Sequence, residues 1–227
     1  KLAYILIKDV VRKDAKDTLE FFEREGVEVK VISGDNYNTV MSIAEEAGIK
    51  NIKGIDATTL NDETIKEAAL NYNIFGRVTP KQKKQIIKAL KENGKTVAMT
   101  GDGINDVLAL KEADCSIAMA SGTDGARNVS QLVLLNSDFS SIPHIVAEGR
   151  RTINNIERSA SLLLVKTIFT ILLVLLCIIL GSKYFFIPIQ LTLITTFTIG
   201  IPSFILALEP NTDIVKGKLL VKVFQQH

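Results

Sequence analysis

Two aspartates four residues apart, Asp102 and Asp106, lie in the run MTGDGIND and are the residues best suited to chemistry in this sequence. An apolar segment at 96–99 precedes them and helix-forming residues follow. Carboxylate oxygens are hard ligands that suit Mg²⁺ and, through the metal, phosphate. The two glycines of the run allow a tight turn and a close approach to a charged group. A solvated acidic loop is the alternative for this run taken alone.

Two other segments carry groups that suit the same chemistry. Ser33, Gly34 and Asp35 end another apolar segment, where a hydroxyl and backbone N–H groups form a natural phosphate site. Lys83 lies in the first turn of a basic helix, where a cation gains nothing from the helix dipole. Neutralising a phosphoryl group would explain this lysine, and a solvated basic face is the alternative. A hydroxyl, an ammonium and two carboxylates are the equipment for phosphoryl transfer, which depends on positioning and charge neutralisation.

The elements that must position these groups alternate along the first 135 residues. Apolar patterns predict strands at 2–7, 27–32, 52–55, 74–77, 96–99, 115–119 and 131–135. Helical patterns with capping residues predict helices at 14–25, 38–47, 62–70, 81–92 and 107–112, with a loop and short helix at 122–129. This alternation predicts an α/β fold with a parallel sheet covered on both faces. The polar segments would then meet at the carboxyl edge of the sheet, where ligands of such folds bind.

Charge is distributed unevenly over the 227 residues. The net charge of +2 is too close to balance to indicate a nucleic-acid partner. Charged residues crowd the first 160 positions and nearly vanish from 162 to 208, which indicates a soluble part joined to a membrane part. The two cysteines, Cys115 and Cys177, fall one in each part, so a reducing cytosolic face is expected rather than a disulfide.

The membrane part is predicted to be a two-helix hairpin with spans near 160–180 and 187–208, each long enough to cross a bilayer. A buried pair of core helices is the alternative. Basic residues flank both outer ends, which predicts an integral, multi-pass protein whose soluble domain is cytoplasmic. These residues are Arg150, Arg151, Arg158, Lys216, Lys218 and Lys222. Lys166 lies inside the first span and is either functional or snorkels toward the cytoplasmic side.

The order of several motifs resembles one family. TGDGIND followed by Ala-Leu-Lys resembles the hinge motif of P-type ATPases, ion pumps built on the haloacid dehalogenase fold. Other segments are similar to further motifs of these pumps in the same order, at 9–12, 32–35, 76–83, 118–123 and 148–155. The resemblance implies a partial, Rossmann-like haloacid dehalogenase sheet at 1–150, belonging to the phosphorylation domain. It implies that residues 151–227 hold the fifth and sixth membrane helices.

The resemblance also implies roles for single residues. Asp102 would bind Mg²⁺ with Asp106 as the second metal residue, and Asn105 and Asp106 would hold the phosphate loop and the waters of the metal. Lys83 would neutralise the phosphoryl oxygens. The residues implied to bind phosphate are Ser33, Gly34 and Asp35. Those implied to position the neighbouring loop and the nucleotide are Asp9 and Arg12.

The hairpin departs from the pattern of the pumps, because neither span contains a carboxylate. The implied transport path is made of hydroxyls and one lysine: Lys166, Thr167, Thr170, Thr195 and Thr198. The transported species is therefore open, with a cation as the family-level expectation. The implied cofactors are Mg²⁺ and ATP, and the implied partners are ATP, a transported cation, membrane lipid and the upstream remainder of the pump.

The nucleophile of the family is the aspartate of a DKTGT motif, and the 227 residues contain no such motif. The resemblance implies that it and the nucleotide-binding insertion precede Lys1. These residues alone would then be unable to form an aspartyl phosphate, and would be unstable or dependent on the rest of the pump. Two alternatives stay open. One is a haloacid-dehalogenase-like phosphatase on a membrane anchor, which needs its own DxD nucleophile. The other is a nonenzymatic pump remnant.

Overall fold

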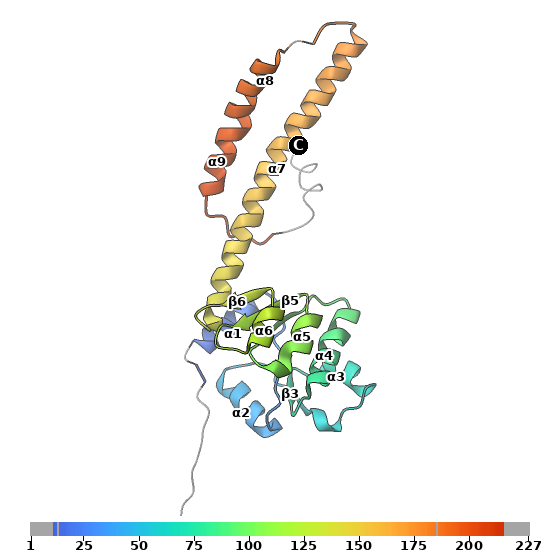
Figure 1. The fold of residues 1–227 in the computed structure, drawn as a ribbon, viewed down its shortest axis with the longest axis vertical. Helices are drawn as coiled ribbons and strands as arrows, with labels where there is room; N and C mark the ends of the chain where they lie inside the picture. Colours follow the sequence, from blue (N-terminus) through green and yellow to red (C-terminus); the bar gives the residue numbers. More distant parts are fainter. Residues whose placement is uncertain (1–10, 13, 185, 216–227) are drawn as a thin grey trace, which may run out of the picture. The chain divides into compact units, whose positions relative to one another are not determined.

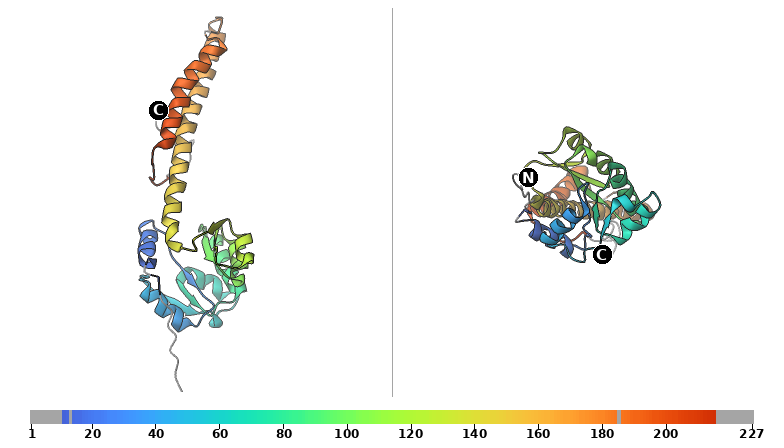
Figure 2. Two further views of the ribbon diagram at one scale, coloured as in Figure 1. Left: turned by 60° about the vertical axis from the view of Figure 1, so that its left-hand side comes forward. Right: turned by 90° about the horizontal axis from the view of Figure 1, so that it is seen from below.

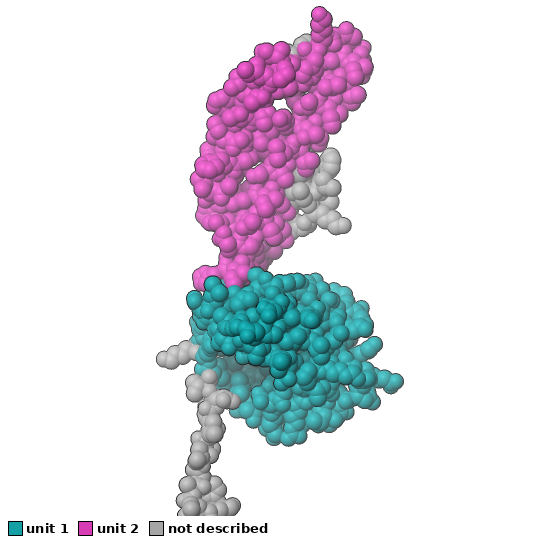
Figure 3. Space-filling model, in the orientation of Figure 1, with its two compact units in different colours: residues 1–143 teal, residues 144–227 magenta. Residues whose placement is uncertain are grey.

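The computed structural model describes residues 11, 12, 14–184 and 186–215. The chain divides into two compact units, Lys1–Pro143 and His144–His227, which Figure 3 colours separately. The predicted strand at 2–7, Asp9 and the lysines beyond residue 215 lie outside the described residues. The functional division predicted at 150/151 stays a prediction.

The first unit contains two three-stranded parallel sheets. One has the order β1-β3-β2, and the other has the order β4-β5-β6. In the first, Ile32 is opposite Phe75; in the second, Thr100 is opposite Ile117. Among the described residues, β1 and β4 each pair on one side only. The strands are β1 (Val31–Ile32), β2 (Gly54–Asp56), β3 (Ile74–Gly76), β4 (Ala98–Gly101), β5 (Cys115–Met119) and β6 (Leu132–Leu134).

Helices separate the strands, as Figures 1 and 2 show, so the predicted parallel α/β architecture is confirmed. They are α1 (Ala15–Arg24), α2 (Tyr37–Glu46), α3 (Thr64–Asn71), α4 (Pro80–Glu92), α5 (Val107–Glu112) and α6 (Asp124–Val129), with short turns η1 (Ala57–Thr59), η2 (Ile104–Asp106) and η3 (Phe139–Ser141). The strand predicted at 27–32 was too long. Only its last two residues pair with β3, and no other described strand lies beside the rest.

One apolar core joins the two sheets. Phe75 from the first sheet and Ala118 from the second are both fully buried in it, together with Ile86 of α4 and Leu110 of α5. Burying a side chain of the size of Phe, Leu or Ile stabilises a fold by about 1.5–3 kcal/mol. The shared core therefore holds the two sheets in one unit.

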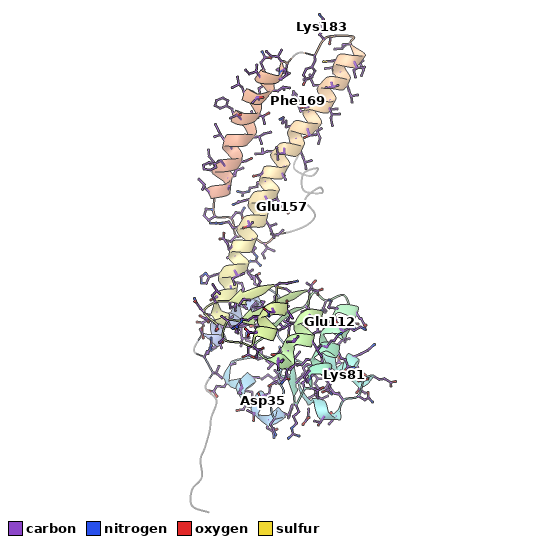
Figure 4. All side chains as sticks on the ribbon, viewed as in Figure 1. Asp35, Lys81, Glu112, Glu157, Phe169 and Lys183 are labelled. Carbon is purple, nitrogen blue, oxygen red and sulfur yellow. The ribbon has the colours of Figure 1, made fainter. Side chains whose placement is uncertain are left out.

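The second unit is a helical hairpin. A long helix, α7 (Ile142–Ile179), lies beside a second helix made of α8 (Pro188–Thr195), η4 (Thr196–Gly200) and α9 (Ile201–Leu208) (Figures 1 and 2). Lys183 lies in the connection between them (Figure 4). Both helices are long and apolar enough to cross a membrane, with mean hydropathies of 2.9 and 1.9 in their most apolar windows.

The helices of the hairpin have the lengths and surfaces of membrane helices. The 38 residues of α7 span about 57 Å, which exceeds the roughly 30 Å hydrocarbon core of a bilayer. Apolar side chains in its second half are exposed, including Phe169 at 57% and Leu172 at 60%. A soluble core pair would bury such side chains, so the exposed surface favours the membrane interpretation.

Side chains of α7 hold the segment that leaves α9. The Asn155 side-chain amide donates to the carbonyl oxygen of Ala207 at 3.1 Å, and that of Asn154 donates to the carbonyl oxygen of Asp213 at 3.0 Å. Arg158 forms an ion pair with Glu209. The last carbonyls of a helix lack partners within the helix. Asn155 therefore satisfies a carbonyl of the last helical turn, while Asn154 and Arg158 fix the segment that follows it.

Replacing Asn155 with leucine is expected to loosen the hairpin without changing the hydropathy of either span. The variant leaves the Ala207 carbonyl without its donor, and such a loss costs about 1–3 kcal/mol. Thermal unfolding of the complete protein in detergent, followed by proteolysis near residue 209, measures the effect. Asn128→Leu changes an exposed asparagine of α6 and is the control. Equal melting of the two variants would contradict the role given to Asn155.

Candidate functional site

The turn after β1 is fixed by its own side chains and by the loop after β3. The Ser33 hydroxyl donates to the Asp35 carboxylate at 2.8 Å and accepts from the Asp35 backbone N–H at 3.1 Å. The N–H of Arg77 donates to the Asp35 carbonyl oxygen, and that of Val78 donates to the Ser33 carbonyl oxygen. Gly34 and Asp35 are exposed, and Figure 4 shows Asp35 on the surface of the unit. The turn is therefore held in place while its tip remains accessible.

Gly76, the last residue of β3, makes this arrangement possible. A Cβ atom at this position would lie 2.4 Å from the Cα atom of Tyr37, the first residue of α2. Contacts this short with backbone are not tolerated, so only glycine fits here. Gly76 begins the segment 76–83 that resembles a motif of the pumps. Its contact with Tyr37, however, depends on tertiary structure and has no signal in the sequence.

Lys83 and Asp106 form a buried ion pair. The start of α4 is fixed by a capping box, in which Thr79 and Gln82 bond reciprocally, and by Pro80 at the first helical position. This places Lys83 one turn inside the helix, with its ammonium 2.7 Å from Oδ1 of Asp106 and only 11% of its side chain exposed. The solvated-face alternative for Lys83 is wrong. Its neighbour Lys81, by contrast, has 72% of its side chain exposed.

The two glycines beside Asp106 have separate roles. A Cβ atom on Gly101 would lie 2.7 Å from the Cβ atom of Asp106, so the strand end and η2 approach closely. The backbone N–H of Gly103 donates to Oδ2 of Asp106 at 3.1 Å. Both carboxylate oxygens of Asp106 are thus engaged, one by Lys83 and one by Gly103. The pair connects the carboxyl end of β4 with the helix that follows β3.

Asp102 and Asn105 differ from Asp106 because both are exposed. No described residue donates to the Asp102 carboxylate, and its backbone carbonyl oxygen accepts from the N–H of Thr123 at 2.8 Å. Gly122 packs directly on this backbone, since a Cβ there would lie 2.6 Å from the Asp102 carbonyl oxygen. The loop after β5 therefore supports the residue predicted to bind the metal.

The donor set fits Mg²⁺ in part. The free carboxylate of Asp102 is a suitable hard ligand. Each carboxylate oxygen of Asp106 already accepts one hydrogen bond, from Lys83 or from Gly103, and its remaining lone pairs can accept from the waters of the metal. The described residues contain no group of three His, Cys, Asp or Glu side chains that could hold a metal. Further ligands would have to come from a phosphoryl group or from residues beyond those described.

Arg12 lies beside a different loop. Its guanidinium donates to the carbonyl oxygen of Ser137 at 3.0 Å and lies 3.8 Å from the Asp138 carboxylate. Hydrogen bonds from Ser140, with a contribution from Arg12, hold the pKa of Asp138 below its usual value. The Ser137 hydroxyl in turn accepts from the backbone N–H of Ser121, in the loop that contacts Asp102. Both roles implied for Arg12, positioning the neighbouring loop and the nucleotide, stay predictions.

A hollow of the first unit lies away from these residues. A cavity of about 360 Å³ is lined by residues that precede the strands of the first sheet, among them Val29, Lys53 and Asn73. The site residues do not line it, and the amino ends of parallel strands carry no predicted chemical group. We therefore assign the site to the carboxyl ends, where Ser33 and the Lys83–Asp106 pair lie.

Parallel strands with polar turns after β1 and β4 define an α/β domain of the Rossmann-like hydrolase class. A family model described as haloacid dehalogenase-like hydrolase matches residues 1–114, and the chain belongs to this family. A probable cation-transporting ATPase, exp7 of Streptococcus pneumoniae, is 46% identical over 97% of the chain and 30% of its own length. The calcium-transporting ATPase CtpE of Mycobacterium tuberculosis is 46% identical over 93% of the chain and 28% of its own length.

A solved structure agrees with these relatives. A zinc-transporting PIB-type ATPase in the E2.Pi state has a TM-score of 0.64 and 25% identity, covering 88% of the chain and 28% of the solved chain. The predicted resemblance to P-type ATPases is confirmed. The chain spans about 30% of the length of the curated relative exp7.

Proposed function

We propose that the chain is part of an ATP-driven P-type transporter that moves a cation across a membrane. The observation that carries the proposal is the buried Lys83–Asp106 pair, whose aspartate belongs to the same turn as the exposed Asp102. A buried cation held next to an accessible acidic turn suits a dianionic phosphoryl group, whose transfer depends on charge neutralisation. The names of the relatives favour cation transport over other uses of the fold.

Each site residue has a role in this proposal. The tip of the turn at Ser33 and Gly34 donates hydrogen bonds to phosphoryl oxygens, and Asp35 orients the Ser33 hydroxyl through its hydrogen bond. Lys83 neutralises the phosphoryl charge. Asp102 would hold Mg²⁺, which would supply further neutralisation, and Asp106 and Asn105 would hold its waters.

The nucleophile of the proposed reaction is an aspartate outside these 227 residues. It attacks the terminal phosphorus of ATP, the bond to ADP breaks, and an aspartyl phosphate forms that water later hydrolyses. A phosphatase on a membrane anchor, which would need a DxD nucleophile, is the first alternative to test. The nonenzymatic remnant remains the second alternative to test.

The transport path is proposed to run along the hydroxyl groups of the hairpin. The hydroxyls of Thr195 and Thr198 donate to carbonyl oxygens one turn earlier, at 2.6 and 2.7 Å, so their lone pairs remain free to face a cation. The hydroxyls of Thr167 and Thr170 are arranged in the same way on α7. Lys166 would act as a fixed counter-cation of the path.

The main chain of the second helix supports this choice of path. The segment η4, from Thr196 to Gly200, is a π-helical turn, a rare form that occurs mostly at functional sites. Pro202 follows and has no N–H to donate to the carbonyls of that turn. Backbone oxygens in this stretch are hard ligands that a cation can share with the threonines. Membrane lipid would surround the hairpin, with the soluble unit on the cytoplasmic side of the cell membrane.

Phosphoenzyme formation in the complete protein tests the proposal. With radiolabelled ATP and Mg²⁺, the protein is expected to form an acid-stable, hydroxylamine-labile phosphoenzyme that EDTA prevents. Hydrolysis of a phosphoester without such an intermediate would instead support the phosphatase alternative, and no hydrolysis at all would support the remnant. Stimulation of ATP hydrolysis by a panel of cations then identifies the transported species.

A further inference from the structure

The loop that follows β5 supports Asp102 only by contacts with its backbone. Thr123 donates its N–H to the Asp102 carbonyl oxygen at 2.8 Å. Gly122 lies so close that a Cβ atom would reach 2.6 Å from that oxygen and 3.0 Å from the Asp102 Cα atom. The direction of the exposed Asp102 carboxylate therefore depends on where this loop lies.

The loop is in turn held by one guanidinium group. Arg127 of α6 donates through Nη1 to the carbonyl oxygen of Gly122 at 3.1 Å and to that of Ala120. Its other terminal nitrogen forms an ion pair with Asp124. Arginine suits this task because its planar group offers several donors in a fixed geometry. The Arg127 side chain thus holds both Ala120 and Gly122, the latter directly before Thr123.

Other contacts of the loop cannot replace this one. The N–H of Ala120 donates to the Leu134 carbonyl oxygen, and the N–H of Ser121 donates to the Ser137 hydroxyl. Both bonds hold the side of the loop that faces β6. Among the described residues, the carbonyl oxygens of Ala120 and Gly122 are held by Arg127, and Gly122 is the residue that packs on the Asp102 backbone.

We propose that Arg127 is a positioning residue for the Mg²⁺ ligand Asp102, acting through the backbone of Ala120–Gly122. The inference rests on the proposed role of Asp102 and goes beyond it, because Arg127 contacts neither the metal nor phosphate. Residues that orient a metal ligand typically account for 10- to 100-fold in metal affinity. Arg127 contacts the loop that supports Asp102 and not Asp102 itself, so we expect its loss to weaken metal affinity by the lower end of that range.

The test measures metal affinity directly in the complete protein. Mn²⁺, which gives an electron paramagnetic resonance signal, replaces Mg²⁺ as the probe, and free Mn²⁺ is titrated against protein. Arg127→Ala is expected to weaken Mn²⁺ binding about tenfold. Arg127→Lys is expected to recover most of it, because an ammonium also donates to carbonyl oxygens. The melting temperature of each variant shows whether the soluble unit remains folded.

Two further variants make the outcomes distinct. Arg24→Ala removes an exposed arginine of α1 and should leave Mn²⁺ binding unchanged. Asp102→Asn should abolish the same binding. If Asp102→Asn weakens binding but a folded Arg127→Ala does not, the positioning role is wrong and the proposed function stands. If Asp102→Asn has no effect, the metal assignment itself fails. If Arg127→Ala unfolds the unit by itself, Gly122→Ala is the test variant, because its methyl group displaces the loop from Asp102. If Gly122→Ala leaves Mn²⁺ binding unchanged, the inference is overturned.

Discussion

Replacing Lys83 with methionine is expected to destabilise the first unit by about 3–5 kcal/mol and to abolish phosphoryl transfer. The ammonium lies 2.7 Å from Asp106, and both side chains are about nine-tenths buried, with 11% and 10% exposed. Methionine fills a similar volume but leaves the Asp106 carboxylate buried without a counter-ion. Removing one partner of a buried ion pair typically costs this amount.

A double variant separates stability from catalysis. In Lys83→Met with Asp106→Asn, the buried charge is gone and the asparagine oxygen still accepts from the N–H of Gly103. Chemical denaturation should show that most of the lost free energy of unfolding returns. Phosphoenzyme formation should not return, because the cation that neutralises the phosphoryl group is still missing.

Lys81→Met is the matched control. Lys81 is on the same helix, but its pair with Asp62 is exposed on both sides, at 72% and 70%. Exposed pairs contribute about 0–1 kcal/mol, so this variant should unfold nearly as the parent does. If the two single variants were equally stable, the buried pair would not be the stabilising feature described above.

The architecture of the soluble unit was predictable because its signals are local. Alternating apolar and helical patterns located every described strand and helix, and the Thr79-Pro80 start of α4 correctly placed Lys83 in the first turn. The glycines of the acidic turn indicated close approach, and Gly101 indeed contacts Asp106. Chemistry that follows from residue type and position on one element is visible in the sequence.

Features that depend on two distant segments were not predictable. Charge alone left the burial of Lys83 open, because its neighbours on α4 are also lysines. The contacts of Gly76 with Tyr37 and of Gly122 with Asp102 join loops that are 20 or more residues apart. The support that Arg127 gives to the loop after β5 has no motif of its own. In each case the decisive interaction joins segments distant in sequence, and in the contacts of Gly76, Gly122 and Arg127 at least one side of it is backbone, which every residue type shares.

In the hairpin, too, local features were predictable from the sequence and features that depend on packing were not. Hydropathy predicted both spans, and both appear as helices. The second helix has nearly the expected ends, but α7 begins at Ile142, well before the predicted start near residue 160. The π-helical turn at Thr196–Gly200 and the hydrogen bonds from Asn154 and Asn155 to the end of α9 were not predicted. Gly200 and Pro202 marked an interruption without specifying its form. Periodicity identifies an apolar helix, but irregular hydrogen bonding within it depends on packing.

The two aspartates of the acidic turn are expected to respond oppositely to the same substitution. Asp102 is exposed and its carboxylate has no donor among the described residues, so Asp102→Asn should change the free energy of unfolding by less than about 0.5 kcal/mol. Asp106 is buried against Lys83, so Asp106→Asn leaves a buried cation without a counter-ion and should cost about 3–5 kcal/mol.

At Asp102 the substitution should impair function without a loss of stability. Asp102→Asn removes the carboxylate proposed to bind Mg²⁺, and phosphoenzyme formation should fall by about 100-fold or more in a fully folded protein. Urea denaturation and phosphoenzyme formation in the complete protein measure the two effects separately. The assignment of Asp102 to the metal is refuted if Asp102→Asn reduces phosphorylation only as far as it reduces the folded fraction. An Asp106→Asn protein as stable as the parent would show that Lys83 finds another buried partner. Asp102→Asn therefore tests the metal assignment, and Asp106→Asn tests the buried ion pair.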